Sequence, residues 1–269
     1  MGLDALFGKS RVLIGMVHLG PLPGSPGYLG SMAEVIRRAV EDALALESGG
    51  LDGAVVENFG DTPFYPERVP PETVAAMAVA LAEVRRAVRF PLGANALRND
   101  AGAALALAAA CGAAFVRVNV HSGASVTDQG LVQGRAHETL RLRERLWARA
   151  PEDAPLVFAD VDVKHASPLG TFDLGQAAAD TYYRGRADVL LVTGRGTGRE
   201  TSMDDVRRVR EAVPEAPVLV ASGVTDRTVA RAVREAHGAL VGTWLKRDGQ
   251  VDAPVDRERV RALVEAAKG

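Results

Sequence analysis

Short apolar runs alternate along the whole chain with stretches in which alanine, arginine and glutamate recur at helical spacing. The apolar runs predict eight strands, over residues 12–19, 53–59, 91–97, 115–121, 155–165, 189–194, 217–224 and 239–245. The helical period predicts eight helices, over residues 31–48, 71–88, 100–110, 135–149, 174–184, 202–213, 226–236 and 256–267. Ser31 and Ser202 stand where N-cap residues are expected.

Eight consecutive strand and helix units follow one another without a linker, over a length at which a barrel of about 250 residues is typical. We therefore predict an α/β fold consisting of a single (β/α)8 TIM barrel that spans residues 1–269. A doubly wound open sheet is the alternative. It needs a glycine-rich turn after the first strand, and residues 19–27 hold three prolines instead.

The fifth predicted strand ends in an unusual cluster of charge. Asp160, Asp162 and Lys164 fall at every second position, so a regular strand would point all three side chains the same way. Two neighbouring carboxylates should raise the pKa of the lysine, which favours a charged, positioning lysine over a Schiff-base nucleophile. The structural alternative is a polar plug of paired charges that fills the barrel.

Other polar residues gather at the predicted strand ends, which form the catalytic face of a barrel. His18 and His121 are the better acid/base candidates, because imidazole titrates near neutrality, although each could instead be a core histidine. The full set of predicted catalytic residues is His18, Glu57, His121, Asp160, Asp162, Lys164 and His165. The predicted ligand-binding residues are Asn58, Asn95, Asn119, Thr193, Gly194, Ser222, Gly223, Gly242 and Thr243.

The loops after strands seven and eight predict a phosphate site. Ser222 and Gly223 follow the seventh strand, and Gly242 and Thr243 follow the eighth, where barrels often bind phosphate through backbone N–H groups. The alternative is that the glycines only serve tight turns. Lys246 either helps to neutralise the anion or is an exposed loop lysine.

The segment Gly-Arg-Gly-Thr-Gly-Arg at residues 194–199 lacks the spacing of a dinucleotide fingerprint. It is more typical of a loop that covers a ligand. Arg195 or Arg199 could bind an anion there, or could be a solvated loop arginine.

The composition limits the partners that the protein is expected to bind. The 32 basic and 34 acidic residues are interleaved, with a net charge of −2, so we expect no nucleic acid and no attraction to anionic membranes. A single cysteine, Cys111, permits no disulfide within the chain and favours a cytoplasmic setting. No run of eighteen apolar residues occurs, so any membrane association is peripheral.

No cofactor is predicted. His18, His121 and His165 with Glu57, Asp160 and Asp162 could hold a divalent metal, but the usual histidine spacings are missing. The long loops 60–70 and 122–134 are predicted to act as lids. Alternatively they form the interface of a homo-oligomer, which the fold leads us to expect.

Six segments occur together in order: 15–24 (Gly-Met-Val-His-Leu-Gly-Pro-Leu-Pro-Gly), 56–61 (Val-Glu-Asn-Phe-Gly-Asp), 117–121 (Arg-Val-Asn-Val-His), 159–165 (Ala-Asp-Val-Asp-Val-Lys-His), 192–194 and 221–224. In these segments the chain resembles the BtpA/SgcQ family. The resemblance extends across nearly the whole chain. The resemblance implies a phosphate-binding type of barrel, with members named for photosystem I assembly or for a putative role in sugar metabolism. It implies site residues of unassigned role at His18, Glu57, Asn58, Asn119, His121, Asp160, Lys164, His165, Thr193, Gly194, Ser222 and Gly223.

Our prediction from the sequence is an enzyme that acts on a small phosphorylated metabolite, either a sugar phosphate or a nucleotide-derived compound. The reaction expected is proton transfer of the aldol, isomerase or lyase type. The alternative is a non-catalytic assembly factor for a membrane complex such as photosystem I. That alternative predicts apolar or basic surface outside the pocket.

Overall fold

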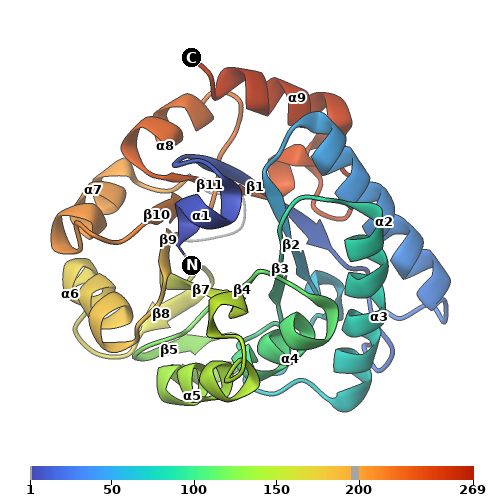
Figure 1. Ribbon diagram of the computed structural model, residues 1–269, viewed down its shortest axis with the longest axis horizontal. Coiled ribbons are helices and arrows are strands. Elements are labelled where there is room, and N and C mark those ends of the chain that lie inside the picture. The colour runs from blue at the N-terminus through green and yellow to red at the C-terminus, as the bar shows by residue number, and fades with distance from the viewer. Residues whose placement is uncertain (1, 195–199) are drawn as a thin grey trace.

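Eight parallel strands surround the centre of the computed structural model, which describes residues 2–194 and 200–269 (Figure 1). In order around the centre they are β1 (Val12–His18), β11 (Gly238–Val241), β10 (Val218–Val220), β9 (Val189–Val192), β7 (Leu156–Asp162), β4 (Phe115–Val118), β3 (Leu92–Asn95) and β2 (Gly53–Glu57). Because β1 pairs with both β2 and β11, the sheet is a closed barrel. This confirms the predicted (β/α)8 fold and excludes the open doubly wound sheet.

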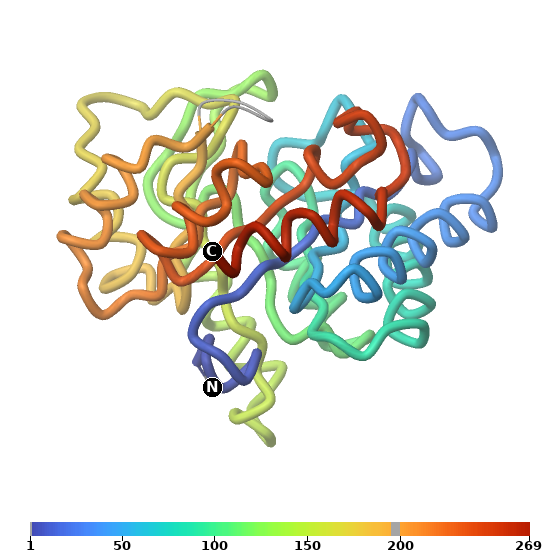
Figure 2. Tube along the Cα trace, turned by 90° about the horizontal axis from the view of Figure 1, so that it is seen from above, coloured from blue at the N-terminus to red at the C-terminus, as the bar shows by residue number. Residues whose placement is uncertain are grey.

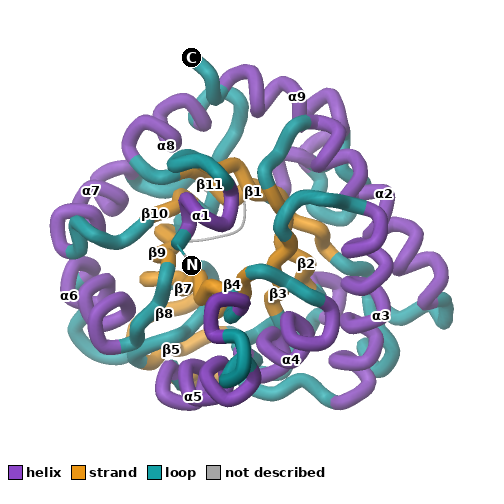
Figure 3. Tube along the Cα trace, in the orientation of Figure 1, coloured by secondary structure: helices purple, strands orange, loops and turns teal. Residues whose placement is uncertain are grey.

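Helices cover the outside of the barrel (Figure 3). They are α2 (Met32–Gly49), α3 (Pro71–Ala87), α4 (Ala101–Cys111), α5 (Ala136–Leu146), α6 (Leu174–Ala179) with its continuation η3 (Asp180–Arg184), α7 (Met203–Ala212), α8 (Val229–Glu235) and α9 (Arg257–Ala266). The predicted serine caps are confirmed. Ser31 accepts a hydrogen bond from the Glu34 N–H, and Ser202 accepts one from the Asp205 N–H.

Side chains alternate between the two faces of the strands, so the hydrophobic core of the protein has two parts. One set of side chains faces the helices and forms the larger cluster, to which Leu13, Val17 and Val116 belong. The alternate set fills the lower half of the barrel, where the rings of Phe115 and Phe158 stack with centroids 4.5 Å apart. The barrel interior is therefore a packed floor on which the polar residues at the upper strand ends lie.

A short helix that the sequence did not predict, α1 (Leu3–Phe7), closes the lower end of the barrel. Leu3 is buried among the interior side chains, and the ring of Phe7 lies 6.0 Å from that of Phe115. Figure 2, which views the barrel from the side, shows α1 near the N label at one end of the molecule. Any ligand must therefore enter from the opposite end, where the strands terminate.

Strand β7 contains an irregularity that changes the predicted charge cluster. Asp160 pairs with Leu191, whereas Asp162 pairs with the next residue, Val192, so the strand holds one extra residue at this point. Leu191 faces the barrel interior, and Val192 faces the helices. Asp162 is therefore shifted out of the face that Asp160 occupies, and the prediction that Asp160, Asp162 and Lys164 share one face is wrong for Asp162.

The loop at residues 122–134, predicted as a lid, forms part of a small antiparallel sheet. Its strands are β5 (Ala124–Thr127) and β6 (Gly130–Gln133), and β5 also pairs with β8 (Ala166–Pro168). The small sheet thus joins the loop after β4 to the loop after β7 at the upper end of the barrel. Its role as a lid or as an oligomer interface stays a prediction.

Within residues 2–194 and 200–269, no helix combines the length and the apolar character that crossing a membrane requires.

Candidate functional site

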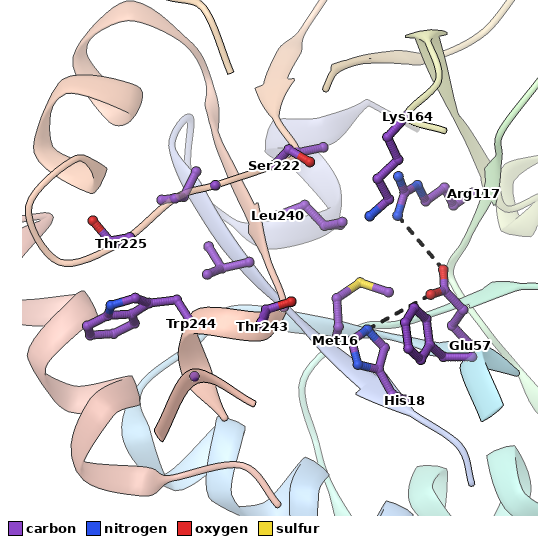
Figure 4. A pocket seen from close by; sticks show the side chains of 17 residues that line it. Met16, His18, Glu57, Arg117, Lys164, Ser222, Thr225, Leu240, Thr243 and Trp244 are labelled. Carbon is purple, nitrogen blue, oxygen red and sulfur yellow. Dashed lines mark ion pairs between the residues drawn. The ribbon is translucent and has the colours of Figure 1, made fainter. Parts of the chain in front are cut away.

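A cavity of about 310 Å³ opens at the upper end of the barrel (Figure 4). It collects seven of the predicted site residues: His18, Glu57, Lys164, Ser222, Gly223, Gly242 and Thr243. Its further lining residues are Met16, Phe59, Arg117, Ala221, Val224, Thr225, Leu240, Val241, Trp244 and Gly249. Charged side chains form one wall, and the loops after β10 and β11 form the other.

The charged wall is built around Arg117, which the sequence reasoning did not select. Its Nε and Nη2 donate to the two carboxylate oxygens of Asp160 at 3.1 and 3.0 Å, and its Nη1 lies 3.8 Å from Oε2 of Glu57. All three side chains are buried. Despite burial, the two carboxylates hold the pKa of Arg117 above its ordinary value. The guanidinium thus stays charged and neutralises Asp160.

The predicted ligand-binding asparagines support this pair from below. Asn119 donates to Oδ2 of Asp160 at 3.1 Å, and Asn95 donates to Oδ1 of Asn119 and to the carbonyl oxygen of Arg117. Neither lines the cavity. Asn58 lies further away, where it donates to Asp61 and accepts from the N–H of Leu97. These three amides hold neighbouring polar groups in place, and their contact with a ligand stays a prediction.

Glu57 is the carboxylate that faces the cavity. Figure 4 shows it between Arg117 and His18, whose Nε2 lies 3.9 Å from its Oε1. Burial raises the pKa of Glu57, although Arg117 and Lys164 oppose this shift. A buried carboxyl group with a raised pKa can take up and release a proton closer to neutral pH than an exposed one, which suits a general acid/base.

The pKa of Lys164 differs from the prediction. Burial lowers it, and the guanidiniums of Arg117 and Arg98 add to this effect, while Glu57 and Asp160 oppose it. Arg98, which the sequence reasoning also missed, is buried and donates to the carbonyl oxygen of Lys164 at 2.6 Å. The expected rise in the lysine pKa is wrong because burial, together with two unforeseen arginines, outweighs the two carboxylates.

His18 lies between the charged wall and the glycine loops. Its ring stacks on that of Phe59, with centroids 4.6 Å apart. Burial lowers the pKa of His18 well below its ordinary value, and the positive charges of Lys246, Lys164 and Arg117 lower it further. The imidazole is therefore neutral in the folded protein near neutral pH.

This neutral histidine makes the stability depend on pH. As the pH falls below about 6.5, the unfolded chain takes up a proton at His18 while the folded chain does not, so stability decreases until the lowered folded pKa is passed. Replacing His18 by glutamine should remove up to about 1.4 kcal/mol of that loss per pH unit. Urea unfolding at about pH 7.5 and 5.5 measures it. His137→Gln, at an exposed site on α5, serves as the control and should leave the slope unchanged.

Two predicted catalytic histidines lie outside the cavity. The Nε2 of His121 is 2.8 Å from the carbonyl oxygen of Gly185, at the end of η3, and its ring is buried there. It points this way because β4 ends at Val118, so strand alternation no longer governs position 121. His165 is exposed, in a turn after β7, with a φ of 57°. The structure therefore does not bring these two histidines to the cavity, and their catalytic role stays a prediction.

The opposite wall holds the predicted phosphate cradle. Ser222 is buried, and its hydroxyl has no hydrogen-bond partner among the described residues. Gly223 has a φ of 64°, a conformation that favours glycine. A Cβ atom on Gly242 would lie 3.3 Å from Met16 Cγ and 3.5 Å from His18 Cε1, so this glycine keeps the space beside His18 open.

The remaining predicted residues of this region serve the fold. Thr193 donates its hydroxyl to the carbonyl oxygen of Asp162, and Gly194 is buried; neither lines the cavity. Lys246 is neither an exposed lysine nor a ligand of the cavity, because its amine is buried in an ion pair with Asp42 of α2 at 2.5 Å. Arg195 and Arg199 lie outside the described residues.

Among the residues that the structure describes, no three histidine, cysteine or carboxylate side chains are placed to hold a metal ion together. The cavity can instead bind an anion, through Arg117, Lys164 and the glycine loops, and it can exchange protons through Glu57.

Residues 9–269 match the BtpA family. An uncharacterized protein of Thermococcus kodakarensis is 48% identical over 260 residues, which cover 97% of this chain and 96% of that protein. The photosystem I biogenesis protein BtpA of Synechocystis sp. is 42% identical over 266 residues, covering 99% and 91% of the two chains. The putative sgc region protein SgcQ of Escherichia coli K12 is 34% identical over 266 residues, covering 98% and 96%.

Solved structures share the barrel at low sequence identity. Tryptophan synthase from M. tuberculosis matches with a TM-score of 0.61 at 18% identity, covering 98% of this chain and 96% of that one. Thiamine phosphate pyrophosphorylase from Pyrococcus furiosus matches with a TM-score of 0.58 at 12% identity, covering 96% of each chain. These matches concern the fold, whereas the sequence relationships reach across nearly the whole chain. The chain belongs to the BtpA family.

Proposed function

We propose that this protein is an enzyme that binds a small phosphorylated metabolite in the cavity above the barrel and moves a proton on it. The observation that carries the proposal is the division of one cavity into two walls. Glu57, Arg117 and Lys164 face it from one side, and the loops of Ser222 and Gly242 face it from the other. A ligand that spans the cavity would place an anionic group on one wall and its reacting carbon near the other.

The size and charge of the cavity support a small anionic ligand. A volume of about 310 Å³ lies at the lower end of the ~300–1,000 Å³ range of ligand pockets. The unpartnered hydroxyl of Ser222 can donate to a phosphate oxygen, and glycines at 223 and 242 let backbone N–H groups approach it closely. Ser222, Gly223, Gly242 and Thr243 are accordingly the proposed phosphate cradle.

The charged wall supports proton transfer. Glu57 has the raised pKa of a general acid/base, and Arg117 can stabilise negative charge that develops on a substrate oxygen. Reactions of the aldol, isomerase and lyase types all need these two functions. His18 lies within 3.9 Å of Glu57 and completes the polar surface on which the substrate rests.

The names of the relatives supply a second candidate. The Synechocystis relative is named for photosystem I biogenesis, which would suit a non-catalytic assembly factor. Thiamine phosphate pyrophosphorylase is named for a phosphorylated compound, but at 12% identity it supports only the fold. An assembly factor needs no ligand in the cavity, so ligand binding distinguishes the two candidates.

Inorganic phosphate provides the first test. At a phosphate concentration about 100 times the dissociation constant, stabilisation should reach about 2.7 kcal/mol, read as a rise in the unfolding temperature at constant ionic strength. Ser222→Ala and Gly242→Ala should reduce the rise, the second because its methyl group enters the cradle. Ser167→Ala, on the exposed face of β8, is the matched control and should retain it.

A panel of phosphorylated metabolites follows under the same conditions, with chloride as the reference salt. A member that fits the whole cavity should raise the unfolding temperature beyond the effect of inorganic phosphate at equal concentration. If neither phosphate nor any panel member shifts the transition, the enzyme proposal fails and the assembly factor is favoured.

A further inference from the structure

The chain has four lysines, and one of them differs from the other three because its amine forms no ion pair with any residue that the structure describes. Lys9 pairs with Asp52, Lys246 pairs with Asp42 at 2.5 Å, and Lys268 pairs with Glu265 at 2.7 Å. Lys164 has no carboxylate oxygen within 4.0 Å of its amine in the described part of the chain, although it lines the cavity. The unpaired lysine is thus the one that a ligand would meet.

The neighbouring carboxylates are already engaged. Asp160 accepts two hydrogen bonds from Arg117, and Glu57 lies 3.8 Å from the same guanidinium. Arg98 brings a second guanidinium to this cluster and binds the backbone carbonyl of Lys164. Two carboxylates therefore face two arginines, and an ammonium at position 164, which is partly buried, would be a surplus positive charge.

We propose that the Nζ atom of Lys164 is a nucleophile that forms a Schiff base with the carbonyl carbon of a phosphorylated aldehyde or ketone. The proposal rests on the proposed function and gives it a substrate class. Figure 4 shows the lysine amine reaching into the cavity beside Arg117, with the Ser222 hydroxyl turned toward the same open space. A phosphate held near Ser222 would leave the carbonyl end of a short ligand close to this amine.

The step balances within the residues of the cavity. The neutral amine attacks the carbonyl carbon, a C–N bond forms, and the carbonyl oxygen takes a proton while nitrogen loses one. A second proton, which Glu57 can supply, converts this hydroxyl into water as the leaving group, and a protonated C=N bond results. The positive iminium nitrogen then acidifies the adjacent C–H group, whose proton the Glu57 carboxylate accepts.

The electrostatic setting favours the reactive form of the amine. Burial lowers the pKa of Lys164, and Arg117 lowers it next most strongly. A larger fraction of this amine is therefore neutral near neutral pH than at an exposed lysine, as nucleophilic lysines require. Lys246 is a useful contrast, because it is more deeply buried than Lys164 but is held in an ion pair by Asp42, outside the cavity.

Borohydride trapping tests the proposal. The protein is incubated with glyceraldehyde 3-phosphate or with dihydroxyacetone phosphate, reduced with sodium borohydride, and analysed by intact mass and peptide mapping. Lys9→Arg and Lys268→Arg together form the background, since both residues are surface lysines in ion pairs and arginine keeps their charge. The expected adduct adds the mass of the ligand less one oxygen atom, at Lys164, and excess inorganic phosphate reduces its yield.

The variant Lys164→Arg separates a covalent role from an electrostatic one. Arginine has a similar length but cannot form an imine, so the variant should lose the adduct, while the cradle of Ser222 and Gly242 should preserve the phosphate-dependent rise in unfolding temperature. If phosphate stabilises the protein and neither probe labels Lys164 above Lys246, the Schiff-base proposal is overturned while the proposed function stands. If phosphate has no effect and no adduct forms, both proposals fail together.

Discussion

Replacing Arg117 by alanine is expected to destabilise the folded protein by about 3–5 kcal/mol, because it leaves buried carboxylates without their partner. The Asp160 side chain is fully buried, and that of Glu57 is 6% exposed. With the guanidinium removed, Asn119 would be the one side chain among the described residues that still donates a hydrogen bond to Asp160. Each carboxylate would then have to be protonated or stay charged in a buried site without its main partner, and either outcome favours the unfolded chain.

Urea unfolding of the purified variant measures this loss. Arg37→Ala is the control, since Arg37 pairs with Glu34 and Glu41 on the exposed face of α2 and should cost much less. A double variant, Arg117→Met with Asp160→Leu, removes the buried pair together and should recover part of the stability. A cost for Arg117→Ala no larger than that for Arg37→Ala would contradict a buried, obligatory pair.

Replacing Glu57 by glutamine is expected to slow proton transfer by about 10²- to 10⁴-fold, the usual contribution of a general acid/base. Glutamine keeps the size of the side chain and removes only its ability to exchange a proton. The rate is measured as exchange of carbon-bound hydrogen, followed by NMR in D₂O, on whichever panel ligand stabilises the protein most. Glu258→Gln, at an exposed position on α9, is the control.

The pH profile adds a readout specific to this role. Because burial raises the pKa of Glu57, the wild-type rate should fall as the pH drops through that raised value, when the carboxylate that accepts the proton is lost. The residual rate of Glu57→Gln should lack this acidic limb. An exchange rate in the glutamine variant equal to that of the wild type would remove Glu57 from the mechanism and leave its ion pair as its only role.

Sequence patterns were sufficient for the fold. Strand alternation and helical period follow from local geometry, and they placed all eight barrel strands in order. They also located the loops after β10 and β11, since a barrel always presents its strand ends on one face. The helix α1 was not predicted, because a five-residue segment has too little periodicity to be distinguished from a loop.

The sequence contains a signal for Arg117, a site residue that the prediction did not include. Arg117 lies two positions before Asn119, so the alternation that selected Asn119 also pointed Arg117 into the barrel. A fully buried arginine in the middle of a strand is rare enough to merit selection on position alone.

The sequence by itself determined the barrel, the face that carries the site and seven of the seventeen residues that line its cavity, because each of these depends on periodicity along the chain. Only the tertiary structure decided the direction in which the pKa of Lys164 is shifted. Two aspartates near it in sequence predicted a raised pKa and a positioning role. In the fold, a bulge shifts Asp162 away and Arg117 engages Asp160, since charge pairing depends on distances between strands that no spacing along the chain encodes.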